Sequence, residues 1–89
     1  MQIVFDQGET RHVKLKIKNI KNEPFQITSA EFSFSGKYDR EVLQSGQASI
    51  VGHVLDVVIT PPAAGYYILK YTYIIGDETL VDIVEVVVT

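Results

Sequence analysis

The residues of this chain that could do chemistry are few, and its two histidines are the first to consider. His12 and His53 each begin an alternating, strand-like segment of the sequence. Two such strands usually lie side by side and antiparallel, which places their starts at opposite ends of the pair. A zinc site needs three or four ligands in tetrahedral geometry, and two separated histidines do not supply them. We therefore expect structural roles for both histidines, with no metal or other cofactor.

Other catalytic patterns are missing from the sequence. Cysteine is absent, and no serine lies in a G-x-S-x-G elbow. The six glycines are dispersed among turns and form no phosphate-binding loop. Asp77 and Glu78 share a predicted hairpin tip, and Asp82 lies nearby in sequence. These carboxylates suggest at most a weak surface cation site, and a solvated turn is the preferred interpretation. We predict a protein without catalytic residues that is not an enzyme.

The marked charge feature is a run of basic residues, the lysine stripe, formed by Arg11, Lys14, Lys16, Lys18 and Lys21. One hypothesis is an anion patch centred on Lys14, Lys16 and Lys18, which would bind phosphate or an anionic glycan. The other is a solvated strand face that resists edge-to-edge pairing. Nucleic-acid sites usually interleave aromatic residues for stacking, and this stripe has none within a chain of net charge −3. We prefer the solvated face and predict no nucleic-acid partner.

Four of the five tyrosines crowd into the segment PPAAGYYILKYTYIIG, residues 61–76. Alternation places Tyr67, Tyr71 and Tyr73 on one face and Lys70 on the other, so these three tyrosines are predicted to point into a core. The order Gly65-Tyr66-Tyr67 after PPAA resembles the tyrosine corner of immunoglobulin-like sandwiches. That resemblance implies that the Tyr67 hydroxyl bonds back to the preceding loop. Tyr66 is left undecided between the core and a ligand-binding strip.

Period-two alternation dominates the rest of the chain, and turn residues separate the alternating runs. The predicted strands cover residues 2–5, 12–19, 27–36, 41–44, 47–51, 53–60, 65–76 and 79–89. No helical stripe is present. The pattern predicts one all-β domain over residues 1–89, an antiparallel β-sandwich of seven to eight strands. Together with the resemblance to the tyrosine corner, it implies an immunoglobulin-like antiparallel β-sandwich. The predicted core is Val13, Leu15, Ile17, Ala30, Phe32, Phe34, Leu55, Val57, Ile59, Tyr67, Leu69, Tyr71, Val84 and Val86.

The order of these pieces resembles immunoglobulin-like modules of bacteriophage virion proteins. The resemblance lies in FDQGETRHVKLKIKN, NEPFQITSAEFSF, a GQASI hairpin, PPAAGYY and a final GDET hairpin, and it covers almost the whole chain. The N-terminal domains of phage baseplate upper proteins and accessory domains of tails and heads are similar. This implies a non-enzymatic structural or assembly module of a phage or prophage particle. The alternative is a carbohydrate- or cell-surface-binding adhesion domain of a bacterial protein.

The outward faces of the last two long strands are less polar than an isolated domain needs. Alternation places Ile68, Ile74, Ile83 and Val87 outward, and a contiguous apolar strip would mark an interface with a virion subunit or with a second copy. No apolar run approaches the roughly 20 residues of a membrane span, and the first residues do not resemble a signal peptide. We therefore expect protein partners and no membrane insertion, with the protein in the virion or, before assembly, in the host cytoplasm.

Overall fold

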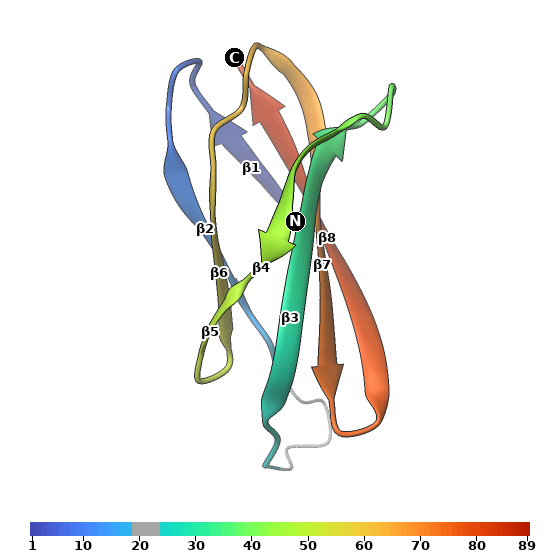
Figure 1. The fold of residues 1–89 in the computed structure, drawn as a ribbon. Coiled ribbons are helices and arrows are strands. Elements are labelled where there is room, and N and C mark those ends of the chain that lie inside the picture. The colour runs from blue at the N-terminus through green and yellow to red at the C-terminus, as the bar shows by residue number, and fades with distance from the viewer. Residues whose placement is uncertain (19–23) are drawn as a thin grey trace.

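The computed structural model describes residues 1–18 and 24–89 as strands joined by turns (Figure 1). The strands in these residues are β1 (Gln2–Phe5), β2 (Arg11–Lys16), β3 (Ile27–Gly36), β4 (Val42–Gln47), β5 (Ser49–Val51), β6 (Val54–Ile59), β7 (Gly65–Ile75) and β8 (Glu78–Val88). The described residues include no helix that is long and apolar enough to cross a membrane. The sequence-based strand boundaries agree with these bounds to within a few residues, because Gly, Pro and Asp turns end each alternating run.

The strands form two sheets that pack face to face. One sheet has the order β1-β8-β7-β3-β4, and the other has the order β2-β6-β5. This arrangement confirms the predicted all-β sandwich. With β4 counted as an added strand, the neighbours β2-β6-β5 and β8-β7-β3 follow the strand order of immunoglobulin domains.

Two details of the topology differ from the sequence-based prediction. The sandwich is not wholly antiparallel, because β1 pairs with β8 in parallel from Gln2 opposite Glu85 to Phe5 opposite Val88. The GQASI segment is not a hairpin either. β4 pairs with β3 in one sheet while β5 pairs with β6 in the other, and the chain changes sheets at Ala48. Ala48 is buried and its N–H donates to Ala30 O at 3.0 Å, which holds this crossing against β3.

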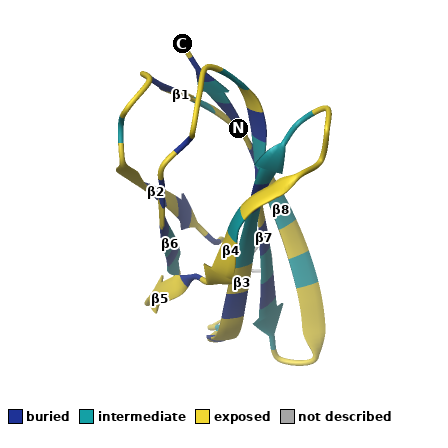
Figure 2. Cartoon of the chain, turned by 45° about the horizontal axis from the view of Figure 1, so that its top comes forward, coloured by how far each residue is buried: buried dark blue, intermediate teal, exposed yellow. Residues whose placement is uncertain are grey.

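The core fills the space between the sheets, and buried positions alternate along β7 and along the C-terminal half of β8 (Figure 2). Every predicted core residue is buried except Phe32, which is only partly buried. Its neighbour on the edge strand β4 is Gly46, which has no side chain to cover the ring. Tyr73, predicted to point inward, is buried as well, and burial extends to four side chains outside the predictions: Phe5, Ile27, Ala48 and Val88.

Candidate functional site

The two histidines lie at opposite ends of the β2–β6 pair. His12 faces Val58 in the register, whereas the His53 carbonyl accepts from the Ile17 N–H at 2.8 Å at the other end. His53 stacks on Phe25 with ring centroids 3.9 Å apart, and its Nε2 lies 2.9 Å from Phe25 O. The described residues contain no group of three or more His, Cys, Asp or Glu side chains that could hold a metal. These contacts join His53 to Ile17 and Phe25, so its observed role is in packing.

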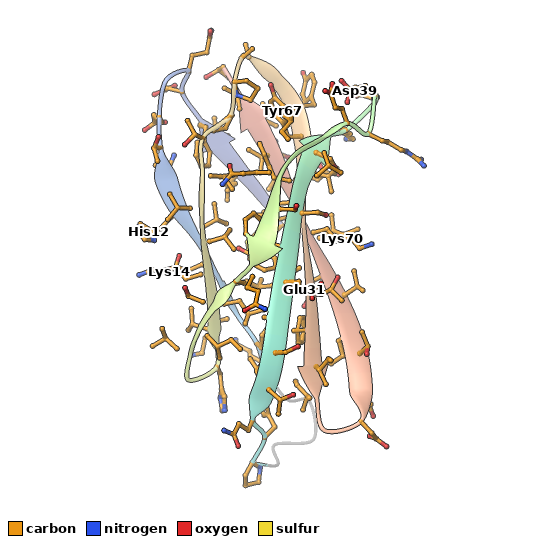
Figure 3. All side chains as sticks on the ribbon, viewed as in Figure 1. His12, Lys14, Glu31, Asp39, Tyr67 and Lys70 are labelled. Carbon is orange, nitrogen blue, oxygen red and sulfur yellow. The ribbon has the colours of Figure 1, made fainter. Side chains whose placement is uncertain are left out.

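The β2 lysines of the stripe, Lys14 and Lys16, lie on the outer face of the three-stranded sheet, opposite the side that carries Lys70 (Figure 3). Lys14, Lys16 and Lys18 are exposed, and Lys21 lies outside the described residues. Arg11 leaves the stripe, because its Nη1 donates to Val4 O at 2.9 Å and its guanidinium lies 4.5 Å from the Phe5 ring centroid.

Asp56 interrupts the positive charge of this face. It lies opposite Lys14 in the register. Its carboxylate contacts His12 Nδ1 at 3.0 Å, from the diagonal position across the strand pair. The lysines are therefore solvated neighbours of a carboxylate, and no aromatic side chain of β2 or β6 lies between them.

We expect no nucleic-acid binding by the lysine stripe. Labelled single- and double-stranded DNA titrated at low salt should show no saturable change in anisotropy at micromolar protein, because the stripe has few charges and no stacking rings. The triple variant Lys14→Gln, Lys16→Gln and Lys18→Gln is the control. Micromolar binding with a steep salt dependence that disappears in this variant would overturn the expectation.

Tyr67 has the geometry of a tyrosine corner. Its hydroxyl donates to Ala63 O, four residues earlier, at 2.8 Å, and its ring stacks on Phe34 with centroids 5.1 Å apart. Gly65, two residues earlier, has a φ of 151°, a backbone conformation that residues other than glycine rarely adopt. The corner therefore fixes the loop after Pro61 against the start of β7.

Replacing Tyr67 by phenylalanine should lower the free energy of unfolding by about 1 kcal/mol, because the partly buried hydrogen bond from the Tyr67 hydroxyl to the Ala63 carbonyl is lost. Urea unfolding followed by far-ultraviolet circular dichroism measures this change. Tyr66→Phe is the matched control, since Tyr66 is exposed on the neighbouring position. Equal urea midpoints for Tyr67→Phe and the parent would show that the hydroxyl contributes nothing to the corner.

The other two inward tyrosines also place their hydroxyls on partners. Tyr71 crosses the core from β7 and donates to Val13 O on β2 at 2.9 Å, which links the two sheets. Tyr73 donates to the Asp82 carboxylate on β8 at 2.6 Å. Burial raises the pKa of both hydroxyls, and the negative charges of Asp56 for Tyr71 and of Asp82 for Tyr73 raise them further. These rings are structural parts of the core and form no ligand-binding strip.

Tyr73 should ionise at a pKa of about 12, above its ordinary value of 10.0. The folded state prefers the protonated phenol, so this contribution to stability is complete below pH 10 and is lost as the pH rises toward 12. Phenolate absorbance during an alkaline titration measures the pKa, with urea unfolding at each pH as the companion measurement. Asp82→Asn should lower the pKa of Tyr73; an unchanged titration in this variant would contradict the assignment.

The four predicted interface residues do point outward from the five-stranded sheet, but they do not face one another. In the β7–β8 register Ile68 faces Glu85, Ile74 faces Thr79 and Ile83 faces Lys70. Polar and apolar side chains therefore alternate across most rows of the strip. The exception is the row of Val87, which faces Tyr66.

That row continues on both sides into an apolar feature that we call the tyrosine band: Val4, Val87, Tyr66 and Tyr38. Val4 pairs with Val87 on the neighbouring strand, and the Tyr38 ring meets the Tyr66 ring edge to face with centroids 6.1 Å apart. Val4, Tyr66 and Tyr38 are 54%, 55% and 77% exposed, which makes this the most exposed aromatic surface of the described chain. An ion pair between Lys37 and Glu85, at 3.6 Å, lies alongside.

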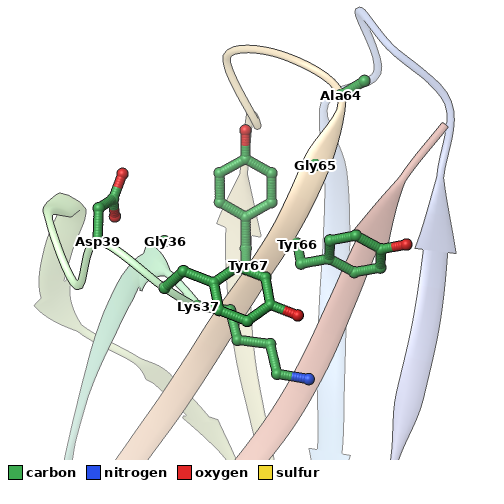
Figure 4. Close-up of a pocket in the computed structure, with 8 residues that line it drawn as sticks. Gly36, Lys37, Asp39, Ala64, Gly65, Tyr66 and Tyr67 are labelled. Atoms are coloured by element: carbon green, nitrogen blue, oxygen red, sulfur yellow. The ribbon is translucent and has the colours of Figure 1, made fainter.

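A shallow pocket of about 250 Å³ adjoins the band, between the β3–β4 connection and the start of β7 (Figure 4). Lys37, Tyr38 and Asp39 line one side, and Tyr66 and Tyr67 line the other. Rings, an ammonium group and a carboxylate can bind a polar partner, but they form no nucleophile–base arrangement. Sequence reasoning missed this site because Tyr38 and Tyr66 are far apart in the chain, although an exposed tyrosine in the polar turn SGKYDR was a usable signal.

Three comparisons with known proteins found no relationship that would assign a family. No protein-family model matches the chain, and the searches of curated proteins and of solved structures each returned no significant match.

Proposed function

We propose that this chain is a non-enzymatic structural or assembly module of a phage or prophage particle, in a tail, baseplate or head accessory position. The tyrosine band carries the proposal. Tyrosine is enriched at the centres of protein interfaces, where a rigid ring buries much area at low entropic cost. The neighbouring Lys37–Glu85 pair provides a polar rim of the kind that surrounds such centres.

The fold supplies a rigid base for this contact. Val4, Val87 and Tyr66 project from three adjacent strands, and the residues beside them in sequence, Phe5, Val88 and Tyr67, are buried in the core. A surface of this kind loses little conformational freedom on binding. The proposed partner is a neighbouring virion subunit, and the proposed location is the virion or, before assembly, the host cytoplasm.

Incorporation into particles tests the proposal. A tagged copy is expressed in the cell that carries the gene, particles are induced and purified on a density gradient, and the tagged protein is quantified in the particle fraction. The parent should band with particles, and the double variant Tyr38→Ser with Tyr66→Ser should lose at least tenfold. Lys14→Ser, on the opposite sheet, should not. Absence of the parent from particles, or full incorporation of the double variant, would overturn the proposal.

A second candidate, a carbohydrate- or cell-surface-binding adhesion domain, is favoured by the pocket beside the exposed Tyr38 ring. Sugars bind by stacking their apolar faces on aromatic rings, while charged side chains form hydrogen bonds with the sugar hydroxyls. A glycan array followed by calorimetry on the best ligand tests this candidate. Saturable binding that Tyr38→Ala abolishes would favour adhesion, and an array without specific signal would exclude the tested glycans.

A further inference from the structure

Half of β8 lies at an open edge of the five-stranded sheet. The pairing with β1 begins at Glu85, so in the described chain residues 79–83 have β7 on one side and no strand on the other. Figure 1 shows β1 beside the C-terminal part of β8 only. Val81 and Ile83 in this stretch are 50% and 54% exposed. We refer to residues 79–83 as the β8 edge.

The hydrogen-bonding groups of the β8 edge have a defined direction. Glu85 N–H donates to Met1 O and Thr89 N–H donates to Phe5 O, both at 2.9 Å, so odd-numbered residues of β8 direct their backbone groups toward the β1 side. The β7–β8 register has no shift along its length. Thr79, Val81 and Ile83 therefore direct N–H and C=O groups to the side where β1 no longer runs.

The other free edges of the described sheets carry features that discourage pairing. β2 presents Lys14 and Lys16, and β5 is only three residues long. The pairing of β4 with β3 contains a register shift. On the short β1, the outward Val4 carbonyl already accepts from Arg11. Lysines, bulges, short strands and inward-pointing charges are usual means by which proteins protect sheet edges. The β8 edge has only the last of these, the inward carboxylate of Asp82, which already accepts from the Tyr73 hydroxyl.

We propose that the β8 edge binds the β8 edge of a second copy of this chain, antiparallel and about a two-fold axis at Val81. Charge selects this register among the neighbouring ones. Centring on Asp82 would place two carboxylates opposite each other, and centring on Leu80 would place Asp82 opposite Glu78 of the second copy. Centring on Val81 places Val81 opposite itself, Thr79 opposite Ile83 and Leu80 opposite Asp82, with no like charges directly opposite within residues 79–83. Asp77 and Glu85 share a row in this register, but that row lies beyond the pairing because β1 covers Glu85.

This pairing satisfies the open backbone groups of both copies. Three residue pairs, at positions 79 with 83, 81 with 81 and 83 with 79, each exchange two N–H to C=O hydrogen bonds. The two five-stranded sheets then form one continuous sheet with an apolar outer row of Val81 and Ile83 side chains. The inference deepens the proposed assembly function and rests on it for its biological setting, although the contact itself follows from the edge geometry.

Cysteine cross-linking tests the contact, and the cysteine-free sequence makes each new thiol unique. Val81→Cys places two Cα atoms about 5.5 Å apart across the axis, within disulfide range. Thr72→Cys is the matched control, because Thr72 lies beside Val81 on the same outer face but one strand inward. Its Cα atoms would be roughly 14 Å apart in the dimer. Under mild oxidation Val81→Cys should form covalent dimer at least tenfold faster than Thr72→Cys.

Two further variants test the register. Thr79→Cys and Ile83→Cys should each cross-link slowly alone, since the two-fold axis separates identical residues by four positions. An equimolar mixture of the two should form the mixed dimer quickly. Sedimentation equilibrium gives the reversible counterpart: the mass of the parent should rise from 10.0 kDa toward about twice that value with concentration. Val81→Lys, which leaves the β7 ladder intact, should weaken this association at least tenfold.

A parent that remains monomeric at millimolar concentration would overturn the inference, as would equal cross-linking rates for Val81→Cys and Thr72→Cys. The outcome is separable from the proposed function. If Val81→Cys cross-links fast but the protein is absent from particles, the edge contact is supported and the particle role is contradicted. If the parent is monomeric but bands with particles, the particle role is supported and the edge contact is contradicted.

Discussion

Replacing Tyr71 by alanine should lower the free energy of unfolding by about 3–5 kcal/mol, a large part of the roughly 5–15 kcal/mol available to a domain of this size. Tyr71 is fully buried and is among the largest side chains of the core. Its removal leaves a cavity between the sheets and takes the hydrogen-bond donor away from Val13 O. Urea unfolding of the variant and the parent measures the difference.

Tyr71→Phe separates the two contributions. It keeps the ring and removes only the hydroxyl, so the expected loss falls to about 1 kcal/mol. If Tyr71→Ala and Tyr71→Phe destabilise the protein equally, cavity formation is not the main cost. If neither variant changes the urea midpoint, the ring does not join the two sheets in solution.

Phe34→Ala is the second change with a large expected effect, again about 3–5 kcal/mol. Phe34 is fully buried on β3 and stacks on Tyr67, so its loss also removes packing from the tyrosine corner. Phe32→Ala is a close control, since it truncates the same ring type on the same strand and face. Phe32 is only partly buried beside Gly46, and its truncation should cost clearly less.

The same urea experiment also tests coupling between Phe34 and the corner. In the Phe34→Ala background, Tyr67→Phe should cost less than in the parent, because the stacked partner that orients the hydroxyl is gone. Additive losses would show that the Phe34–Tyr67 stack does not support the Ala63 hydrogen bond. A Phe32→Ala variant as unstable as Phe34→Ala would contradict the burial difference between the two rings.

The sequence was informative about strands because β2, β6 and β7 each have one buried and one wet face. Alternation along Val13, Leu15 and Ile17 predicted their burial without any tertiary information. Phe32 has the same pattern as Phe34, but its exposure depends on a glycine of the neighbouring strand. Burial of this kind depends on what covers a side chain, and a period-two pattern does not contain that information.

Pairing between distant strands was the second feature that the sequence did not predict, after the partial exposure of Phe32. Nothing local in residues 2–5 indicates that β1 joins the last strand in parallel, and the short spacing between β4 and β5 favoured a hairpin over a change of sheet. The tyrosine band follows from those pairings, since Val4, Val87 and Tyr66 meet only after β1, β8 and β7 are adjacent. The tyrosine band could therefore not be predicted from the sequence, because it depends on strand pairings that local patterns do not contain.

The parallel pairing of β1 with β8 has a mechanical consequence. The chain enters β1 at one end of the paired segment and leaves β8 at the other, so a pull on the two termini slides the strands along each other. Their hydrogen bonds, from Met1 O to Thr89 N, are then loaded in shear and together, whereas a hairpin pulled at its open end unzips one bond at a time. All the hydrogen bonds between β1 and β8 thus resist tension along the chain together. The two sheets stay packed until β1 separates from β8.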